Sequence, residues 1–202
     1  MNSLKQSWQR AWGDLDLGAP DDLHQQLVAA YREPHRHYHS LQHLQECLAH
    51  FESARELANH PSEVELALWF HDAIYDPRAK DNEQRSADWV VAELTRRGVC
   101  FASAQRVHAL IMATCHTATP SEPDQQLLVD IDLSILGASP ARFAEYNTQV
   151  GAEYGWVEIG LYQTKRKAIL KGFLARPAIY STAFFKERYE QQARANLQCL
   201  IG

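Results

Sequence analysis

Apolar residues recur at helical spacing along nearly the whole chain, and this periodicity constrains the fold more than any other feature. Leu41, Leu44, Leu48 and Phe51, for example, follow one another in steps of three, four and three. Such steps place side chains on one face of an α-helix. No segment shows the sustained alternation of a half-buried strand, and no Asn-Gly or Asp-Gly hairpin signal occurs. The sequence therefore predicts an all-α chain of about eight to ten helices.

Length and composition fit one globular domain. The chain has 202 residues, of which 46% are hydrophobic and 22% are charged. That is enough for one large core and short for two domains. We therefore predict a single-domain helical bundle over residues 1–202. Its functional site is expected within about residues 31–137, and C-terminal helices over residues 139–201 are expected to pack on that core.

Charge and cysteine usage argue against several classes of protein. The formal net charge is -5 and no basic block is visible, so a nucleic-acid polymer is not the expected partner. The four cysteines are scattered without a CxxC pair, which argues against a disulfide framework and a structural zinc ribbon. No apolar run approaches the ~20 residues of a membrane span. We expect a cytoplasmic monomer or homodimer without a membrane partner.

Histidines crowd one short stretch, "REPHRHYHSLQHL", at residues 32–44. Four of the chain's ten histidines lie in it. His39 and His43 are four residues apart. If a helix begins near Tyr38, both side chains lie on one face of it.

A second unusual stretch is "LWFHDAIYD", where His71 and Asp72 interrupt an apolar run. Pro61 and a Ser62-x-x-Glu65 capping box predict the start of a helix, and we expect it to include residues 64–75. Burying a carboxylate there without a partner would be very costly. Asp72 therefore needs a cation, a set of hydrogen-bond donors or an exposed helix end.

A third stretch, "LLVDIDLSILG", places Asp130 and Asp132 among apolar neighbours. Three helices would thus each bring a metal-type ligand into apolar sequence, and a divalent cation would satisfy them together. The mixed nitrogen and oxygen set suits manganese, iron, cobalt, nickel or zinc better than calcium, with magnesium a further candidate and one or two ions per chain. From the residues alone, Asp130 and Asp132 remain alternatives.

The order of these residues resembles the HD superfamily of metal-dependent phosphohydrolases, and more closely a group of small bacterial members. The resemblance runs from about Tyr31 to Leu197 and is carried by "EPHRHYHSLQHL", "WFHDAIYD", "DNEQRSAD", "VDIDLSILG" and "QQARANL". It implies an HD-type helical bundle. It also implies metal ligands at His43, His71, Asp72 and Asp132, with Asp72 as the bridging ligand if two metals bind.

The resemblance implies hydrolysis of a small-molecule phosphate mono- or diester, with a nucleotide as one candidate, by metal-activated water. "YHSLQH" is also similar to the "YHN..H" stretch of cyclic-nucleotide phosphodiesterases, although Ser40 stands where those enzymes have Asn. That similarity implies His39 as the general acid and His43 as a ligand. His116 is a second candidate for proton transfer or for a second metal, and a structural role at a helix end stays open for it.

The segment after the His-Asp pair, "DPRAKDNEQRSAD", adds candidates for the surroundings of the site. Asp76, Asn82 and Glu83 could position substrate or support the metal ligands, and helix capping is the alternative. We count Glu83 with the catalytic candidates. Arg36 and Arg85 could hold phosphate by bidentate contacts, and ordinary surface arginines are the alternative.

Two other functions fit the same residues. Some HD proteins use a di-iron site for oxygenase chemistry, which would need His39, His116 or Glu83 as extra ligands. A non-catalytic HD module that binds metal or nucleotide is the third interpretation. Metal identity and phosphate release distinguish the first two.

Overall fold

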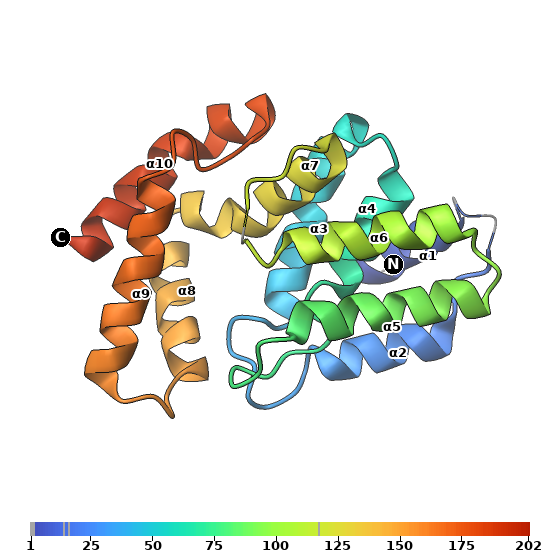
Figure 1. Ribbon diagram of the computed structural model, residues 1–202, viewed down its shortest axis with the longest axis horizontal. Coiled ribbons are helices and arrows are strands. Elements are labelled where there is room, and N and C mark those ends of the chain that lie inside the picture. Colours follow the sequence, from blue (N-terminus) through green and yellow to red (C-terminus); the bar gives the residue numbers. More distant parts are fainter. Residues whose placement is uncertain (1–2, 14, 16, 117) are drawn as a thin grey trace. The chain divides into compact units, whose positions relative to one another are not determined.

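The fold is all-α, as the periodicity predicts. The computed structural model describes the chain except residues 1–2, 14, 16 and 117. The described residues form ten α-helices and two short 3-10 helices, and they contain no strand (Figure 1). The all-α prediction is therefore confirmed, whereas the assignment to the HD type of bundle stays a prediction.

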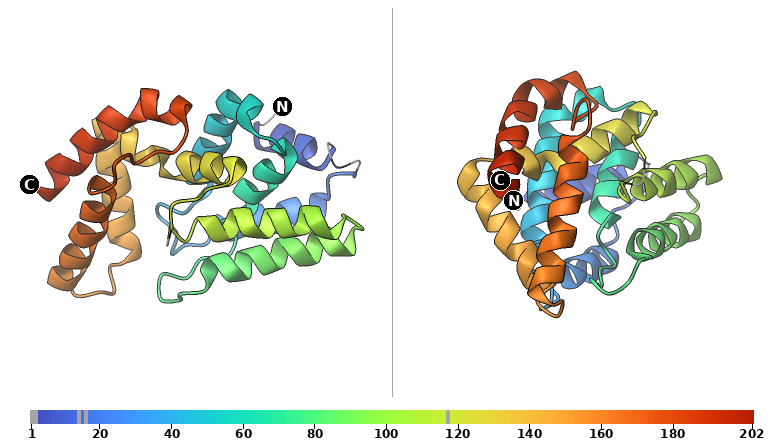
Figure 2. Two further views of the ribbon diagram at one scale, coloured as in Figure 1. Left: turned by 45° about the horizontal axis from the view of Figure 1, so that its top comes forward. Right: turned by 60° about the vertical axis from the view of Figure 1, so that its left-hand side comes forward.

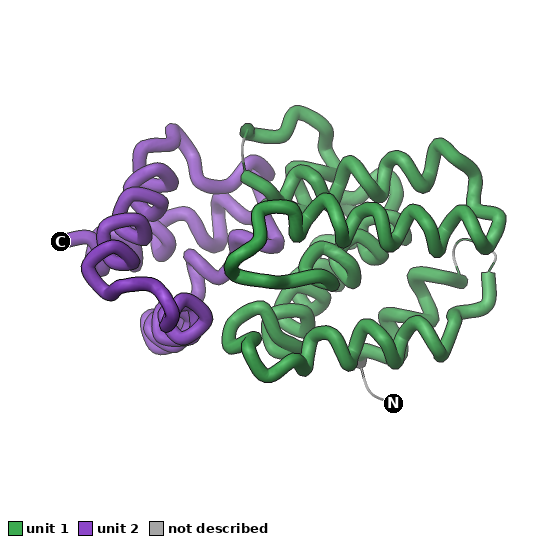
Figure 3. The backbone as a smooth tube through the Cα atoms, turned by 60° about the horizontal axis from the view of Figure 1, so that its bottom comes forward, with its two compact units in different colours: residues 1–129 green, residues 130–202 purple. Residues whose placement is uncertain are grey.

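The chain divides into two compact units, residues 1–129 and 130–202 (Figure 3). The division falls inside one helix, α7 (Pro123–Asp132). We describe each unit by itself, and the single domain expected from the sequence stays a prediction.

Unit 1 is built around one helix that is buried on all sides. Every residue of this helix, α4, from Ser62 to Phe70 is buried. It packs against α1, α3, α5 and α6, and α5 and α6 run beside each other (Figure 1). The helices of unit 1 before α7 are α1 (Ser3–Gly13), α2 (Asp21–Ala30), α3 (Leu41–Ala54), η1 (Arg55–Leu57), α4 (Pro61–Phe70), α5 (Asn82–Arg96) and α6 (Phe101–Ala113).

The start of α4 is held by tertiary contacts rather than by the predicted capping box, which is wrong. The N-cap residue is His60, and its side chain accepts no hydrogen bond from the backbone of the helix. Instead the carboxylate of Asp124 accepts the backbone N–H groups of Asn59 and His60 at 2.7 and 3.0 Å. Glu65 is unavailable as a capping partner, because it is fully buried and pairs with Arg10 at 3.0 Å.

Unit 2 contains η2 (Leu133–Gly137), α8 (Pro140–Glu153), α9 (Ile159–Leu174) and α10 (Ala183–Ile201), with α9 lying against α10 (Figure 2). A close approach explains Gly137, because a Cβ atom there would lie 2.6 Å from the Cβ of Tyr189. Asn196 fixes the same contact by donating to the carbonyl oxygens of Leu136 and Ala138 at 2.8 and 2.9 Å.

Among the helices that the structure describes, none combines the length and apolar character needed to cross a bilayer.

Candidate metal centre

The histidine-rich stretch folds as a loop that leads into α3. The helix expected to begin near Tyr38 begins at Leu41, so that expectation is wrong. Ser40 is the N-cap residue, with an extended backbone at φ -117° and ψ -177°. His43 therefore lies in the first turn of α3, while His39 lies in the preceding turn. The two side chains do not share a helix face.

The second stretch also differs from the expected helix over residues 64–75. Helix α4 ends at Phe70, and His71 is its C-cap residue. The ring of His71 ends the helix locally, because its Nδ1 lies 2.7 Å from the carbonyl oxygen of Leu68. Beyond it, the N–H of Ile74 donates to the hydroxyl of buried Ser86 at 3.0 Å. His71 and Asp72 thus sit in a turn at the end of a buried helix.

A buried arginine ties these two segments together. Arg36 donates to the backbone carbonyl oxygens of His39 at 3.3 Å and Ala73 at 3.0 Å, and also to that of Asp72. Its guanidinium carbon lies 5.3 Å from the ring centre of Tyr31 and 5.5 Å from that of Tyr75. In this arrangement Arg36 positions the walls of the site. Its predicted contact with substrate stays a prediction.

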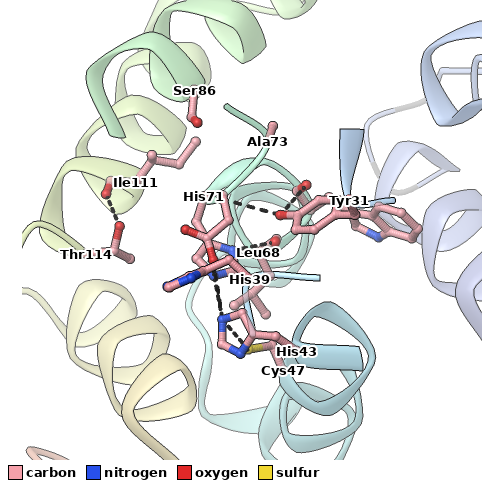
Figure 4. Close-up of polar contacts among 12 residues, drawn as sticks. Tyr31, His39, His43, Cys47, Leu68, His71, Ala73, Ser86, Ile111 and Thr114 are labelled. Carbon is pink, nitrogen blue, oxygen red and sulfur yellow. Dashed lines mark hydrogen bonds and ion pairs between the residues drawn. The ribbon is translucent and has the colours of Figure 1, made fainter. Parts of the chain in front are cut away.

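Three ligand-type atoms form a small triangle inside unit 1. The Nε2 atoms of His43 and His71 are 3.1 Å apart. The Oδ2 atom of Asp72 lies 3.1 Å from Nε2 of His71 and 3.4 Å from Nε2 of His43. Both rings are buried, with exposed fractions of 2% and 1%. Figure 4 shows the rings of His43 and His71 turned toward each other.

The triangle fits a shared divalent cation. Two nitrogens, each about 2.1 Å from one ion, lie roughly 3.0–3.4 Å apart at octahedral to tetrahedral angles. Nδ1 of His71 faces a carbonyl oxygen and must carry the proton there, so the lone pair of neutral His71 is on Nε2. The Oδ2 atom of Asp72 is buried and makes no hydrogen bond with any described residue. Two imidazole nitrogens and a carboxylate oxygen that converge in this way are a donor set that a divalent transition-metal ion accepts.

The electrostatics keep Asp72 in the form that binds metal. Burial alone would raise the pKa of its carboxyl group. The imidazoles of His71, His39 and His43 outweigh that cost, and the net pKa lies well below its usual range. Asp72 is therefore a carboxylate at neutral pH.

Two more residues complete the group of potential ligands. Ligand-type atoms of His43, Cys47, His71 and Asp132 all lie within 4.8 Å of one another. Asp132 is the last residue of α7, the helix that contains the division between the units. Cys47 was not among the predicted ligands. The signal for it was its spacing, since it follows His43 by four residues and lies one turn further along α3 (Figure 4).

Asp130, the alternative to Asp132, has a different set of partners. Its Oδ1 accepts the N–H of Ser181, and its Oδ2 accepts the N–H and the hydroxyl of Thr182, each at 2.7 Å. Both oxygens are thus used inside unit 2. Asp130 has a structural role, and Asp132 is the acid of α7 that joins the group of potential ligands.

His39 lies beside the centre. Its ring stacks on Tyr75 with the centres 4.2 Å apart, and its ring centre is 6.1 Å from that of His43. The stack limits how the imidazole can turn. Its predicted role as a proton donor stays a prediction.

The remaining predicted residues lie in the segments that follow. Asp76 and Asn82 brace one exposed loop, since the side chain of Asn82 bonds both the N–H and the carbonyl of Asp76. Glu83 and Arg85 lie in the first turn of α5. His116 follows α6 with a left-handed backbone at φ 54°. No described contact links the side chains of Asp76, Asn82 or Arg85 to the triangle.

Comparisons of the chain with protein-family models, with curated proteins and with solved structures give no match. Function is therefore inferred from the site itself.

Proposed function

We propose that this protein is a metal-dependent phosphohydrolase of the HD type, acting on a phosphate mono- or diester. The observation that carries the proposal is the triangle of His43, His71 and Asp72, in which two imidazole nitrogens and a buried carboxylate oxygen lie within 3.4 Å of one another. The HD order of these residues in the sequence supports the same conclusion. A nucleotide is one candidate substrate.

His43, His71 and Asp72 would hold one divalent transition-metal ion, with Asp132 as a further ligand. A metal bound there supplies Lewis acidity, which activates water and neutralises charge on phosphoryl oxygens. Neighbouring residues hold the ligands in position. The N–H of Asp72 donates to the hydroxyl of Tyr31 at 3.3 Å, and this contact fixes the backbone that carries the carboxylate.

His39 is the best placed of the predicted proton donors. An imidazole with a pKa of about 6.5 can give a proton to a leaving alkoxide at neutral pH. The ring contact with Tyr75 holds it beside His43. His39→Ala should therefore slow the reaction with poor leaving groups more than with nitrophenolate, which needs no proton.

The test is elemental analysis combined with phosphate release. Wild type, Asp72→Ala and the control variant Glu56→Ala, at an exposed residue of η1, are purified in parallel without chelator. We expect wild type and Glu56→Ala to carry near-stoichiometric metal and to release phosphate from a panel of monoesters, diesters and nucleotides. Asp72→Ala should lose both.

Two results would contradict the proposal. A wild type that stays empty after manganese, iron, cobalt, nickel and zinc are supplied has no metal centre. A wild type that holds iron, consumes oxygen and releases no phosphate is an oxygenase instead.

A further inference from the structure

We propose that the sulfur of Cys47 is a direct ligand of this metal centre, and that the centre prefers zinc, ferrous iron or cobalt to magnesium. The inference rests on the metal centre of the proposed function but not on the reaction that the centre performs. It gives the role of a metal ligand to Cys47, which is not one of the ligands that the HD resemblance implies.

The position of Cys47 supports direct ligation. The residue is 1% exposed and follows His43 by one helical turn. Its Sγ lies 3.7 Å from both Nδ1 and Nε2 of His43. The sulfur therefore lies beside the imidazole of His43, equally near its two nitrogens.

The distance from the sulfur to Nε2 of His43 suits a shared ion. A sulfur at about 2.3 Å and a nitrogen at about 2.1 Å from one zinc ion lie about 3.6 Å apart at the tetrahedral angle. The observed distance to Nε2 of His43 is 3.7 Å. The ligand atoms of His71 and Asp132 lie within 4.8 Å of the same group. For both residues to hold one cation, the sulfur would have to turn away from Nδ1 and toward Nε2 of His43.

The chemistry of sulfur sets the metal class. The thiol of Cys47 would bind as a thiolate, and its proton would pass to solvent when the metal enters. Thiolates select borderline and soft ions, whereas magnesium favours oxygen ligands and keeps its own waters. A set of two imidazoles, one thiolate and carboxylate therefore disfavours magnesium.

Cobalt(II) is the probe, because thiolate ligation gives it a charge-transfer band in the near ultraviolet that imidazole and carboxylate do not. Metal-free protein is titrated with cobalt under reducing, anaerobic conditions. Cys47→Ser is compared with Cys115→Ser, a half-buried cysteine of the same unit that is not in the group of potential ligands. Circular dichroism shows whether each variant folds.

We expect the band in wild type and in Cys115→Ser, unchanged by excess magnesium, and we expect Cys47→Ser to lack it. Cys47→Ser should also bind zinc at least about 10–100-fold more weakly, which is the loss known even for residues that only support ligands. X-ray absorption of zinc-loaded wild type should show a sulfur neighbour at about 2.3 Å. This measurement stands even if Cys47→Ser fails to fold.

Stoichiometric cobalt or zinc in wild type without the band and without a sulfur neighbour would overturn the assignment of Cys47. That result would leave the phosphohydrolase proposal untouched. A wild type that binds neither metal would overturn the centre itself, and both proposals with it.

Discussion

Asp72 and Asp130 are both acids in strongly apolar sequence, and the structure gives them opposite surroundings. Both oxygens of Asp130 accept hydrogen bonds, from Ser181 and Thr182. The Oδ2 atom of Asp72 is buried with two imidazole nitrogens beside it and no hydrogen bond among the described residues. Their pKa values also move in opposite directions. Burial raises the pKa of Asp130 despite its hydrogen bonds, whereas the imidazoles lower that of Asp72.

This contrast separates a structural acid from a functional one. A buried carboxylate is expensive unless its oxygens are satisfied. Both oxygens of Asp130 accept hydrogen bonds within unit 2, so Asp130 stabilises the turn that precedes α10. The groups that approach the buried oxygen of Asp72 are the imidazoles of His71 and His43, which are themselves ligand-type groups. Four variants, taken from the largest expected effect to the smallest, test this distinction.

Asp130→Ala should lower the free energy of unfolding by about 2–4 kcal/mol, since it leaves three half-buried donors of Ser181 and Thr182 without their charged acceptor. Urea denaturation measures the loss. Asp130→Asn keeps one carbonyl oxygen and should lose less. A loss below about 1 kcal/mol for the alanine variant would show that water replaces the carboxylate, and Asp130 would then not be the structural acid of the pair.

Zinc at about 100 times its dissociation constant should raise the free energy of unfolding of wild type by about 2.7 kcal/mol. Asp72→Asn should show no such gain, because its amide cannot replace the carboxylate. Asp130→Asn should gain as much as wild type. Denaturation of all three proteins with and without zinc provides the comparison, and an equal gain in Asp72→Asn would place the metal elsewhere.

Asp132→Asn should weaken zinc binding by about 10–100-fold, or about 1.4–2.7 kcal/mol. Asp130→Asn should bind zinc as wild type does. Competition with a chromogenic chelator gives both affinities. The reverse result would reassign the acid of α7 that serves the centre.

Asp72→Asn should not destabilise the metal-free protein at pH 8, where free imidazoles are neutral, and should stabilise it by up to about 1 kcal/mol. The amide removes a charge from an oxygen that is buried without a hydrogen bond among the described residues. Urea denaturation in the presence of chelator measures this. A loss comparable to that of Asp130→Ala would mean that Asp72 is structural after all.

Local sequence patterns predicted the class of fold and part of the site. The spacing of apolar residues correctly predicted an all-α chain. His43, His71 and Asp72 could be singled out from the residues, and the structure brings their side chains together. The preference for Asp132 over Asp130 came from the resemblance alone.

The errors came from contacts between distant parts of the chain. Asp124 takes over the start of α4 from 64 residues away, and no local pattern can reveal that. Arg36 similarly holds the turn after α4 from the histidine-rich loop, which helps to explain why neither His39 nor Asp72 is helical. Cys47 was not predicted as a ligand, because the familiar metal-site pattern of cysteines is a CxxC pair and Cys47 belongs to none. It is instead four residues from His43, one turn further along α3.

The end of α4 has one more consequence. His71 and Asp72 follow directly on the C-terminus of a ten-residue helix. The aligned peptide dipoles of such a helix place roughly half a negative charge at that end. The field therefore draws a cation toward the triangle before any bond to a ligand forms, and it repels a phosphate group for as long as the cation is absent. We expect binding in a fixed order as a result, with the metal first and the anionic substrate second.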